Sequence, residues 1–296
     1  MASIHLVAIT PSQLIGNDHQ DGYDVGRMER RFLAQGDSWF SLGHVPPWST
    51  TNLLQQFVLS RASVAVNCAH PGEVLAHMVD TSTQQDFLRL LNGRQAWRWH
   101  AVLVSGGGND LIDALNADPG SDRDSTQRTR LLLRADEWAT DTTAVLRYIN
   151  EPGWATFARH LEVVLLRLLA QRDRKAVNRD VPLVLHTYDY LTPRNAPAGP
   201  ALGPWLYKAL HTTYRIPAAD WIRLADVFID RLADLWTTLA ARHAGRNIRV
   251  VDTRGATTRA GAGSTGPTRH WENEIHPTAL GYAELAKVWR PILDAL

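Results

Sequence analysis

Four short stretches of the sequence combine residue types that could carry out nucleophilic chemistry. The stretch at 36–38 ends in Ser38, "NCAHPGE" contains Gly72, "SGGGND" contains Asn109, and "HWENEIHPT" contains His276. A serine hydroxyl is a weak nucleophile at its ordinary pKa and needs a general base to take its proton. Ser38 is therefore a candidate nucleophile, and His276 is the candidate base.

Acyl transfer also needs hydrogen-bond donors where negative charge develops on the carbonyl oxygen. The backbone N–H of Ser38 can supply one donor. Gly72 can bring a second backbone N–H close, because it has no side chain in the way. The side-chain amide of Asn109 can supply a third. The same four stretches thus provide a nucleophile, a base and a candidate oxyanion hole.

These residues can act together only if the fold brings them to one place. Short apolar segments that are rich in β-branched residues and Leu are typical of buried strands. The sequence contains such segments at Arg31–Gln35, Ala62–Asn67, Ala101–Ser105, Pro182–His186 and Ile248–Asp252. Their continuous hydrophobicity favours a parallel sheet that is covered on both faces.

Helical patterns separate the predicted strands, and they span residues 51–61, 81–92, 154–175, 219–245 and 277–293. This alternation favours an α/β layered fold with right-handed crossovers. In such a sheet, ligands bind beyond the carboxyl ends of the strands. Ser38, Gly72 and Asn109 each follow a predicted strand. His276 lies on the connection that leaves the fifth strand, so we expect it at the same edge of the sheet.

The composition bounds the class of protein. The 296 residues include 31 Lys and Arg and 30 Asp and Glu, a net charge of +1, which does not favour nucleic acid or an anionic membrane surface as the main partner. The single cysteine, Cys68, excludes an internal disulfide. We expect one domain over residues 1–296, with 1–29 as an N-terminal extension and 253–270 as a flexible loop.

The N-terminal sequence lacks the pattern of a secretory signal peptide. No stretch approaches the ~20 apolar residues that a membrane span needs. We therefore expect a cytoplasmic protein without a transmembrane segment, and secretion by a route that needs no signal peptide stays open. The sequence leaves the oligomeric state open.

The order of these motifs resembles the SGNH hydrolases, also called the GDSL esterase/lipase family. The matching motifs are Gly36-Asp37-Ser38, Asn67 with Gly72, Gly107-Gly108-Asn109-Asp110 and His276-Pro277. The resemblance covers the chain from position 31 to the C-terminus. It implies a three-layer α/β/α sandwich of the flavodoxin-like kind, with a parallel sheet of about five strands. It implies Ser38 as the nucleophile and His276 as the base, with Gly72, Asn109 and Ser38 itself as the oxyanion-hole donors.

The chain departs from the family pattern at the third catalytic position. The family usually carries Asp three residues before the histidine, where it orients the imidazole through its Nδ1–H, and here that position is Asn273. An amide oxygen can accept the same hydrogen bond, but without a full charge it stabilises the imidazolium less. Glu272, Glu274 and Asp252 are candidates for a substitute carboxylate, although Glu274 is expected to point elsewhere.

Three aromatic residues are candidates for the substrate pocket. Trp39 stands in "GDSWF" where family members usually carry Leu, and it could fill a niche beside the site. Tyr188 and Tyr190 follow the fourth predicted strand and could form a wall of the acyl or alcohol pocket, or could equally serve packing. No close His and Asp pairs indicate a metal site, and we expect no cofactor.

The resemblance implies a serine esterase that hydrolyses carboxylic esters through an acyl-enzyme on Ser38, with a small-molecule or lipid ester as substrate. One alternative is the same site used by an acyltransferase, a thioesterase or a phospholipase. The other is a degenerate family member that binds a ligand without turnover, which the replacement at Asn273 keeps open. Acyl and alcohol specificity are not indicated by the sequence.

Overall fold

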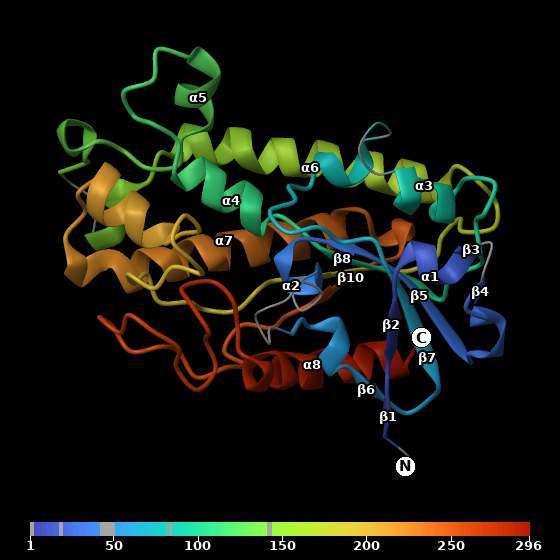
Figure 1. Ribbon diagram of the computed structural model, residues 1–296. Coiled ribbons are helices and arrows are strands. Elements are labelled where there is room, and N and C mark those ends of the chain that lie inside the picture. The colour runs from blue at the N-terminus through green and yellow to red at the C-terminus, as the bar shows by residue number, and fades with distance from the viewer. Residues whose placement is uncertain (1–2, 18–19, 42–50, 81, 83–84, 141–143) are drawn as a thin grey trace.

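The computed structural model describes residues 3–17, 20–41, 51–80, 82, 85–140 and 144–296. At its centre is a six-stranded sheet in which every pair of neighbouring strands runs parallel (Figure 1). The strands lie in the order β10-β9-β8-β5-β7-β2. Their bounds are Val7–Ile9 for β2, Arg30–Gly36 for β5, Ser63–Asn67 for β7, Ala101–Ser105 for β8, Leu183–His186 for β9 and Ile248–Val251 for β10.

The five predicted strands and the parallel α/β fold class are confirmed. Every residue of β7, β8 and β9 is buried, which is why these strands are continuously apolar in the sequence. The sixth strand, β2, lies within residues 1–29, the segment interpreted as an extension. It has only three residues, of which Ile9 alone is buried, so it carries too little hydrophobic pattern to be recognised.

The chain changes direction within the sheet at β5. From β5 it passes to β7 on one side, then returns to β8 on the other side and continues outward through β9 to β10. In an open parallel sheet, such a switch point leaves a crevice outside the carboxyl ends of the two diverging strands. The stretches that contain Ser38, Gly72 and Asn109 follow β5, β7 and β8, so all three begin at this crevice.

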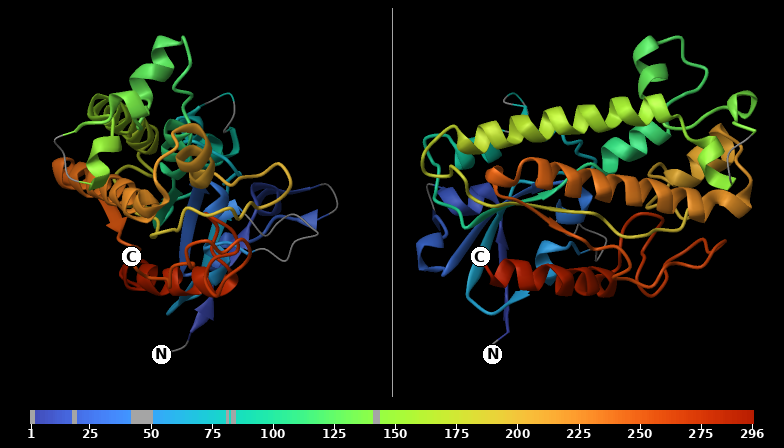
Figure 2. Two further views of the ribbon diagram at one scale, coloured as in Figure 1. Left: turned by 90° about the vertical axis from the view of Figure 1, so that its left-hand side faces the viewer. Right: turned by 180° about the vertical axis from the view of Figure 1, so that it is seen from behind.

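Helices cover the two faces of the sheet, which confirms the layered architecture. Figures 1 and 2 show α3, α6 and α7 on one side and α8 on the other. The α-helices span Pro11–Ile15 (α1), Ser38–Ser41 (α2), Gln85–Leu91 (α3), Gly108–Leu115 (α4), Asp124–Thr129 (α5), Glu151–Asp173 (α6), Trp221–Arg242 (α7) and Ala279–Asp294 (α8). The last begins after Thr278, whose side chain accepts a hydrogen bond from the backbone N–H of Gly281 and so caps the helix.

The helix predicted at 51–61 is wrong. The segment forms a single 3₁₀ turn at Leu54–Gln56 and then the strand β6, Val58–Leu59, which pairs antiparallel with β1, Ile4–His5. The side chain of Asn52 accepts the backbone N–H of Gln55 at 3.1 Å and so stabilises the turn. The apolar residues whose spacing indicated a helix instead pack the turn and β6 against α8. A second small antiparallel pair joins β3, Gly16–Asn17, to β4, Gln20–Asp21.

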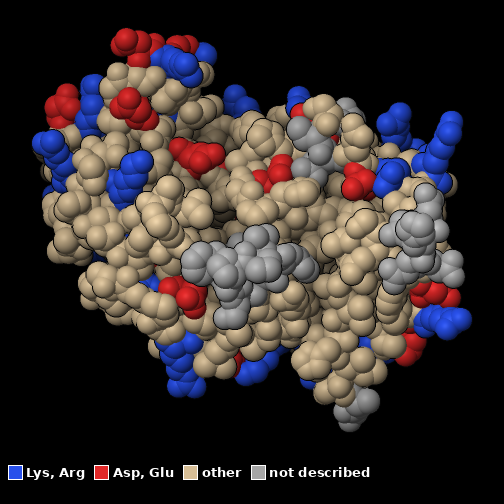
Figure 3. All heavy atoms as spheres, viewed as in Figure 1, with Lys and Arg blue, Asp and Glu red and all other residues tan. Residues whose placement is uncertain are grey.

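Residues 253–270 contain no helix or strand, and their flexibility stays a prediction. No helix among the described residues combines the length and the hydropathy that crossing a membrane requires. On the face viewed in Figure 1, Lys and Arg side chains lie around the periphery and are mixed with Asp and Glu (Figure 3). The charge of this face is therefore dispersed.

Candidate active site

Ser38 is placed by a tight transition from strand to helix. It is the first residue of α2 and follows the last residue of β5, Gly36, by two positions. A Cβ atom at Gly36 would lie 2.8 Å from both the Cβ and the carbonyl oxygen of Ser105 on the neighbouring strand β8. Only glycine allows this approach, so the glycine of the Gly-Asp-Ser sequence is required for backbone packing.

Asp37 anchors the turn beneath Ser38. Its Oδ1 accepts the backbone N–H of Trp39 at 3.0 Å and the hydroxyl of Ser105 at 2.7 Å, and its Oδ2 accepts the hydroxyl of Tyr188 at 2.5 Å. Burial raises the pKa of Asp37 to about 6, although the hydrogen bonds from Tyr188 and Ser105 oppose that shift. Three segments that are distant in sequence are thus joined behind the serine, because His186 also bonds to Ser105 at 2.9 Å.

His276 lies next to Ser38. The imidazole Nε2 is 2.8 Å from the Ser38 Oγ, although 238 positions separate the two residues in the chain. The Nδ1 atom lies 3.1 Å from the Oδ1 atom of Asn273. Both Ser38 and His276 are buried, with 7% and 8% of their surface exposed, so their hydrogen bond is largely shielded from water.

The orientation of the Asn273 amide is fixed by its neighbours. Its Oδ1 also accepts the backbone N–H groups of Ile275, at 3.1 Å, and of His276, at 2.9 Å. An amide NH₂ cannot accept these hydrogen bonds, so the oxygen must face His276. The imidazole then carries its proton on Nδ1 and presents the lone pair of Nε2 to Ser38. This is the tautomer that a general base needs.

Burial lowers the pKa of His276 to about 4. The charged imidazolium loses hydration in this position, and Asn273 offers no negative charge to compensate. The imidazole is therefore neutral at pH 7 and able to accept a proton. The ring of Trp205 meets it edge-on, with 5.4 Å between the ring centroids.

Gly72 lies on the loop that follows β7, and Asn109 lies in the first turn of α4, which follows β8. Gly72 has φ of +75°, and a Cβ atom there would contact nothing within 4 Å, so the left-handed backbone rather than crowding favours glycine. The Asn109 Nδ2 donates one hydrogen bond, 3.0 Å long, to the carbonyl oxygen of Glu73, and its second N–H remains available. Neither the N–H of Ser38 nor that of Gly72 donates to any described residue.

The substitute carboxylates are corrected by the structure. Glu272 is exposed, and Asp252 binds Arg254 and Thr187. The carboxylate of Glu274 turns away from His276 and accepts backbone N–H groups from Arg194, Trp205, Leu206 and Tyr207. These contacts leave Asn273 as the residue that orients the imidazole, and they occupy Glu274 with backbone donors that the sequence did not reveal.

Two buried side chains, Arg194 and Glu274, hold the loop that carries His276, and sequence reasoning missed Arg194. The Arg194 Nη2 donates to the carbonyl oxygen of Asn273 at 2.6 Å, and its Nη1 donates to Ser264 at 3.2 Å. Glu274 ties the same loop to the segment that begins at Trp205, and burial raises its pKa to about 7. Arg194 stands in "TPRN", and an arginine inside a largely apolar stretch was the available signal.

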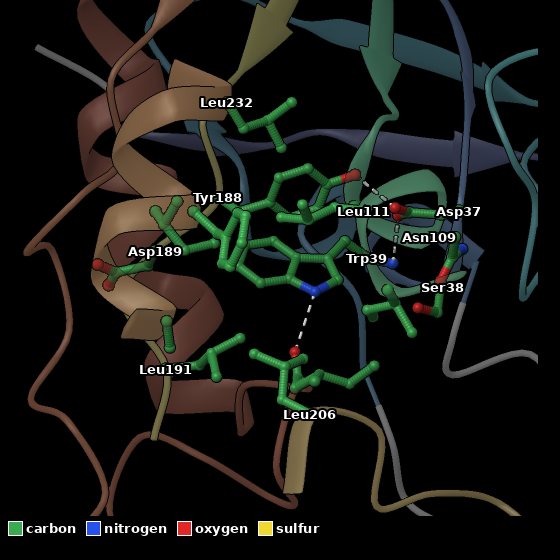
Figure 4. A pocket seen from close by; sticks show the side chains of 16 residues that line it. Asp37, Ser38, Trp39, Asn109, Leu111, Tyr188, Asp189, Leu191, Leu206 and Leu232 are labelled. Carbon is green, nitrogen blue, oxygen red and sulfur yellow. Dashed lines mark hydrogen bonds between the residues drawn. The ribbon is translucent and has the colours of Figure 1, made fainter. Parts of the chain in front are cut away.

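An apolar cavity of about 40 Å³ opens beside Ser38 (Figure 4). A cavity of this size holds roughly three water-sized groups. Helices α4 and α7 and the loop after β9 contribute most of its wall. The lining residues include Leu111, Leu191, Leu206, Ala225, Phe228 and Leu232. The Ser38 side chain thus lines a small apolar space.

The three aromatic candidates behave differently. Trp39 and Tyr188 both line the cavity, and the Trp39 Nε1 is fixed by donating to the carbonyl oxygen of Ile275 at 3.1 Å (Figure 4). Tyr190 does not line it, which corrects that assignment: its hydroxyl donates to Asp230 at 2.6 Å. Residues two apart share a face only in an extended chain, and Tyr188 has φ of +61°, which breaks that alternation.

Within the described ranges, no group of three or more His, Cys, Asp or Glu side chains could hold a metal ion. The groups gathered near Ser38 are its hydroxyl, the imidazole of His276 and amide donors. All of them lie at the carboxyl ends of the central strands.

No protein-family model matches the sequence, and no curated protein matches it. Solved structures similar to the chain include an extracellular lipase from Streptomyces rimosus, at 16% identity and a TM-score of 0.48, covering 90% of this chain and 99% of the lipase. An acetylxylan esterase from Geobacillus stearothermophilus is similar at 14% identity and a TM-score of 0.44, covering 88% and 92%. A putative GDSL-like lipase from Parabacteroides merdae is similar at 16% identity and a TM-score of 0.43, covering 88% and 93%.

The last of these proteins carries the name of the family that the sequence motifs resemble. At these identities and scores, none of the three assigns an activity to this chain.

Proposed function

We propose that the protein is a serine esterase that hydrolyses carboxylic esters with short acyl groups. The observation that carries the proposal is the chain of contacts from Ser38 Oγ to His276 Nε2, 2.8 Å, and from His276 Nδ1 to Asn273 Oδ1, 3.1 Å. Nucleophile, base and orienting acceptor in this sequence of contacts form the arrangement that activates a serine hydroxyl.

In the proposed reaction, His276 takes the proton of the Ser38 hydroxyl while Oγ attacks the ester carbonyl carbon. The carbonyl oxygen becomes an oxyanion, which accepts hydrogen bonds from the N–H groups of Ser38 and Gly72 and from the amide of Asn109. The imidazolium then protonates the departing alkoxide, and an acyl-serine remains. Water attacks this ester with His276 again as the base, and the carboxylic acid leaves as Ser38 regains its proton.

The present hydrogen bonding of the three groups supports their role as donors to the oxyanion. The N–H groups of Ser38 and Gly72 have no acceptor among the described residues, so an oxyanion would not have to displace an internal bond. The contact of Asn109 with Glu73 fixes the amide while it leaves one N–H free. Donors arranged in advance need no reorganisation when the charge develops.

The proposal is tested by hydrolysis of p-nitrophenyl acetate by the wild-type chain and the Ser38→Ala variant. We expect turnover by the wild type and a rate at the uncatalysed background for the variant, with unchanged thermal unfolding because only one oxygen is removed. Comparable turnover by a folded Ser38→Ala variant would defeat the proposal.

One observation favours a second candidate, a binding protein of the same fold that does not turn over its ligand. Asn273 is neutral, so the imidazolium formed during attack gains less stabilisation than beside a carboxylate. The two candidates differ in one respect, since only an esterase releases acid from an ester in amounts that exceed the amount of protein.

A further inference from the structure

A second cavity lies at the other end of the sheet, where the strands begin. It has a volume of about 450 Å³, which falls in the range of small-molecule sites. Its lining includes Arg31, the second residue of β5, and Arg249, the second residue of β10. His100 and Pro182, which immediately precede β8 and β9, line it between them. Since the strands are parallel, this amino edge is opposite to the edge that carries Ser38.

The cavity is strongly cationic. Arginines 31, 98, 179 and 249 line it, and Asp180 is the one carboxylate side chain among its described lining residues. No described carboxylate forms an ion pair with any of the four. Other arginines at this end are paired, because Arg172 and Arg246 both bind Asp173, at 2.7 and 2.8 Å. Four like charges around one concavity repel one another unless an anion lies between them.

Two further observations place positive potential inside the cavity rather than only at its rim. The Nε of Arg31 is buried and has no hydrogen-bond partner among the described residues, which is costly for a donor on a charged group. The backbone N–H of Arg31 donates to the Nδ1 of His100 at 3.1 Å. Burial, followed by the charge of Arg31, lowers the pKa of His100.

We propose that this cavity binds a small molecule that carries two adjacent phosphate groups. Guanidinium groups match phosphate oxygens with paired N–H donors. From β5 to β10 there are three strand intervals, roughly 14 Å, so Arg31 and Arg249 enter the cavity from opposite sides. A diphosphate provides enough charge and enough oxygens to engage arginines that enter from both sides.

The site is independent of the proposed esterase chemistry. Its ligand would bind at the amino edge of the sheet, and nothing in the hydrolytic mechanism uses Arg98, Arg249 or His100. Binding is therefore measured directly, and failure of one proposal leaves the other intact.

The test is calorimetric titration of the full chain with inorganic pyrophosphate and, separately, with orthophosphate, both without metal ions. We expect pyrophosphate to bind about tenfold tighter than orthophosphate or better. The variants Arg98→Gln and Arg249→Gln should each weaken pyrophosphate binding about tenfold, since each removes one charged donor, and added salt should weaken the wild type most. Thermal unfolding of each variant checks its fold.

Arg223→Gln is the matched control. Arg223 is exposed in the first turn of α7, roughly 28 Å along the helix from Arg242, the end that leads to β10. This variant removes the same charge and should bind pyrophosphate within about twofold of the wild type. Absence of pyrophosphate binding, or equal weakening by all three variants, would overturn the proposal.

A second arm separates a free diphosphate from a lipid headgroup with the same chemistry. Vesicles of phosphatidylcholine are compared with vesicles that also contain a bisphosphorylated inositol lipid. Binding of free pyrophosphate that the Arg249→Gln variant loses supports the cavity site, whether or not vesicles also bind. Binding to the anionic vesicles without binding of free pyrophosphate would refute a cavity site.

Discussion

Replacing Asn273 by Asp should make the protein a faster esterase. Asn273 Oδ1 is 3.1 Å from the Nδ1 of His276, so an aspartate would place a negative charge beside the imidazolium that forms during attack by Ser38. At about 4 Å and an effective dielectric constant of about 20, that interaction is worth about 4 kcal/mol. The aspartate is charged before and during attack, so its burial lowers the stability of the fold more than it changes the barrier.

The expected gain in kcat/KM is about 10² to 10³. In a serine protease the reverse change, Asp to Asn, costs about 10⁴ in kcat, partly because the amide imposes the wrong tautomer. Here Asn273 already holds the correct tautomer through the N–H groups of Ile275 and His276, so only the charge is missing. The gain should therefore be smaller than 10⁴.

The pH dependence supplies a second readout. Burial lowers the pKa of His276 to about 4, and activity requires the neutral imidazole, so wild-type kcat/KM should rise as the pH passes upward through that value. A carboxylate at 273 favours the charged form and raises the pKa by about 1 to 3 units. The rise in kcat/KM should move to higher pH by the same amount.

The assay is kcat/KM for p-nitrophenyl acetate between pH 4 and pH 8. Asn273→Leu, which has a similar shape but no acceptor, is the control and should be slower than the wild type. A folded Asn273→Asp variant that is no faster than the wild type, with an unchanged pH profile, would refute the role given to Asn273.

Three other substitutions test the surroundings of Ser38. Asn109→Ala removes one proposed oxyanion donor and should lower kcat by about 10² to 10³ with a small change in KM; a loss confined to KM would contradict the donor role. Tyr188→Phe leaves the buried Asp37 carboxylate short of one hydrogen bond and should cost about 1–3 kcal/mol in urea unfolding; unchanged stability would show that this bond does not hold the turn. Ala225→Leu fills the cavity and should lower kcat/KM for p-nitrophenyl hexanoate about tenfold or more, with acetate within about twofold; equal loss for both esters would place the acyl group elsewhere.

The parallel sheet and the edge that carries Ser38 could be predicted because both depend on local sequence. Strands such as Ala101–Ser105 are apolar throughout and end in glycine or polar residues, and the order of Ser38, Gly72, Asn109 and His276 along the chain determines which strands carry them. The position of the candidate site could therefore be predicted from the ends of the strands, because short sequence patterns indicate where each strand ends.

Contacts between distant segments could not be predicted in the same way. The sequence around Asp37 does not indicate that the hydroxyl of Tyr188 is its partner, because 151 positions separate the two residues. The left-handed φ of Tyr188 that redirects Tyr190 toward Asp230 depends on the packed loop after β9. The partners of Glu274 were equally unpredictable, because the backbone N–H groups that its carboxylate accepts lie 67 to 80 positions away in the sequence.

The helix predicted at 51–61 failed for a related reason. Apolar residues at helical spacing also occur in a turn followed by a short strand, when both faces of that segment pack against other elements. In that segment, pairing of Val58–Leu59 with Ile4–His5 decides the outcome, and neither strand has enough residues to show a period of its own.

The central claim is that His276 activates the hydroxyl of Ser38, and reaction with a fluorophosphonate tests it most directly. The reagent phosphonylates an activated serine, and peptide mass spectrometry locates the adduct. The account predicts one adduct per chain, on Ser38, which forms in the wild type and is lost in the His276→Ala variant. Absence of an adduct on Ser38, or labelling of Ser38 at the same rate without the imidazole, would contradict it.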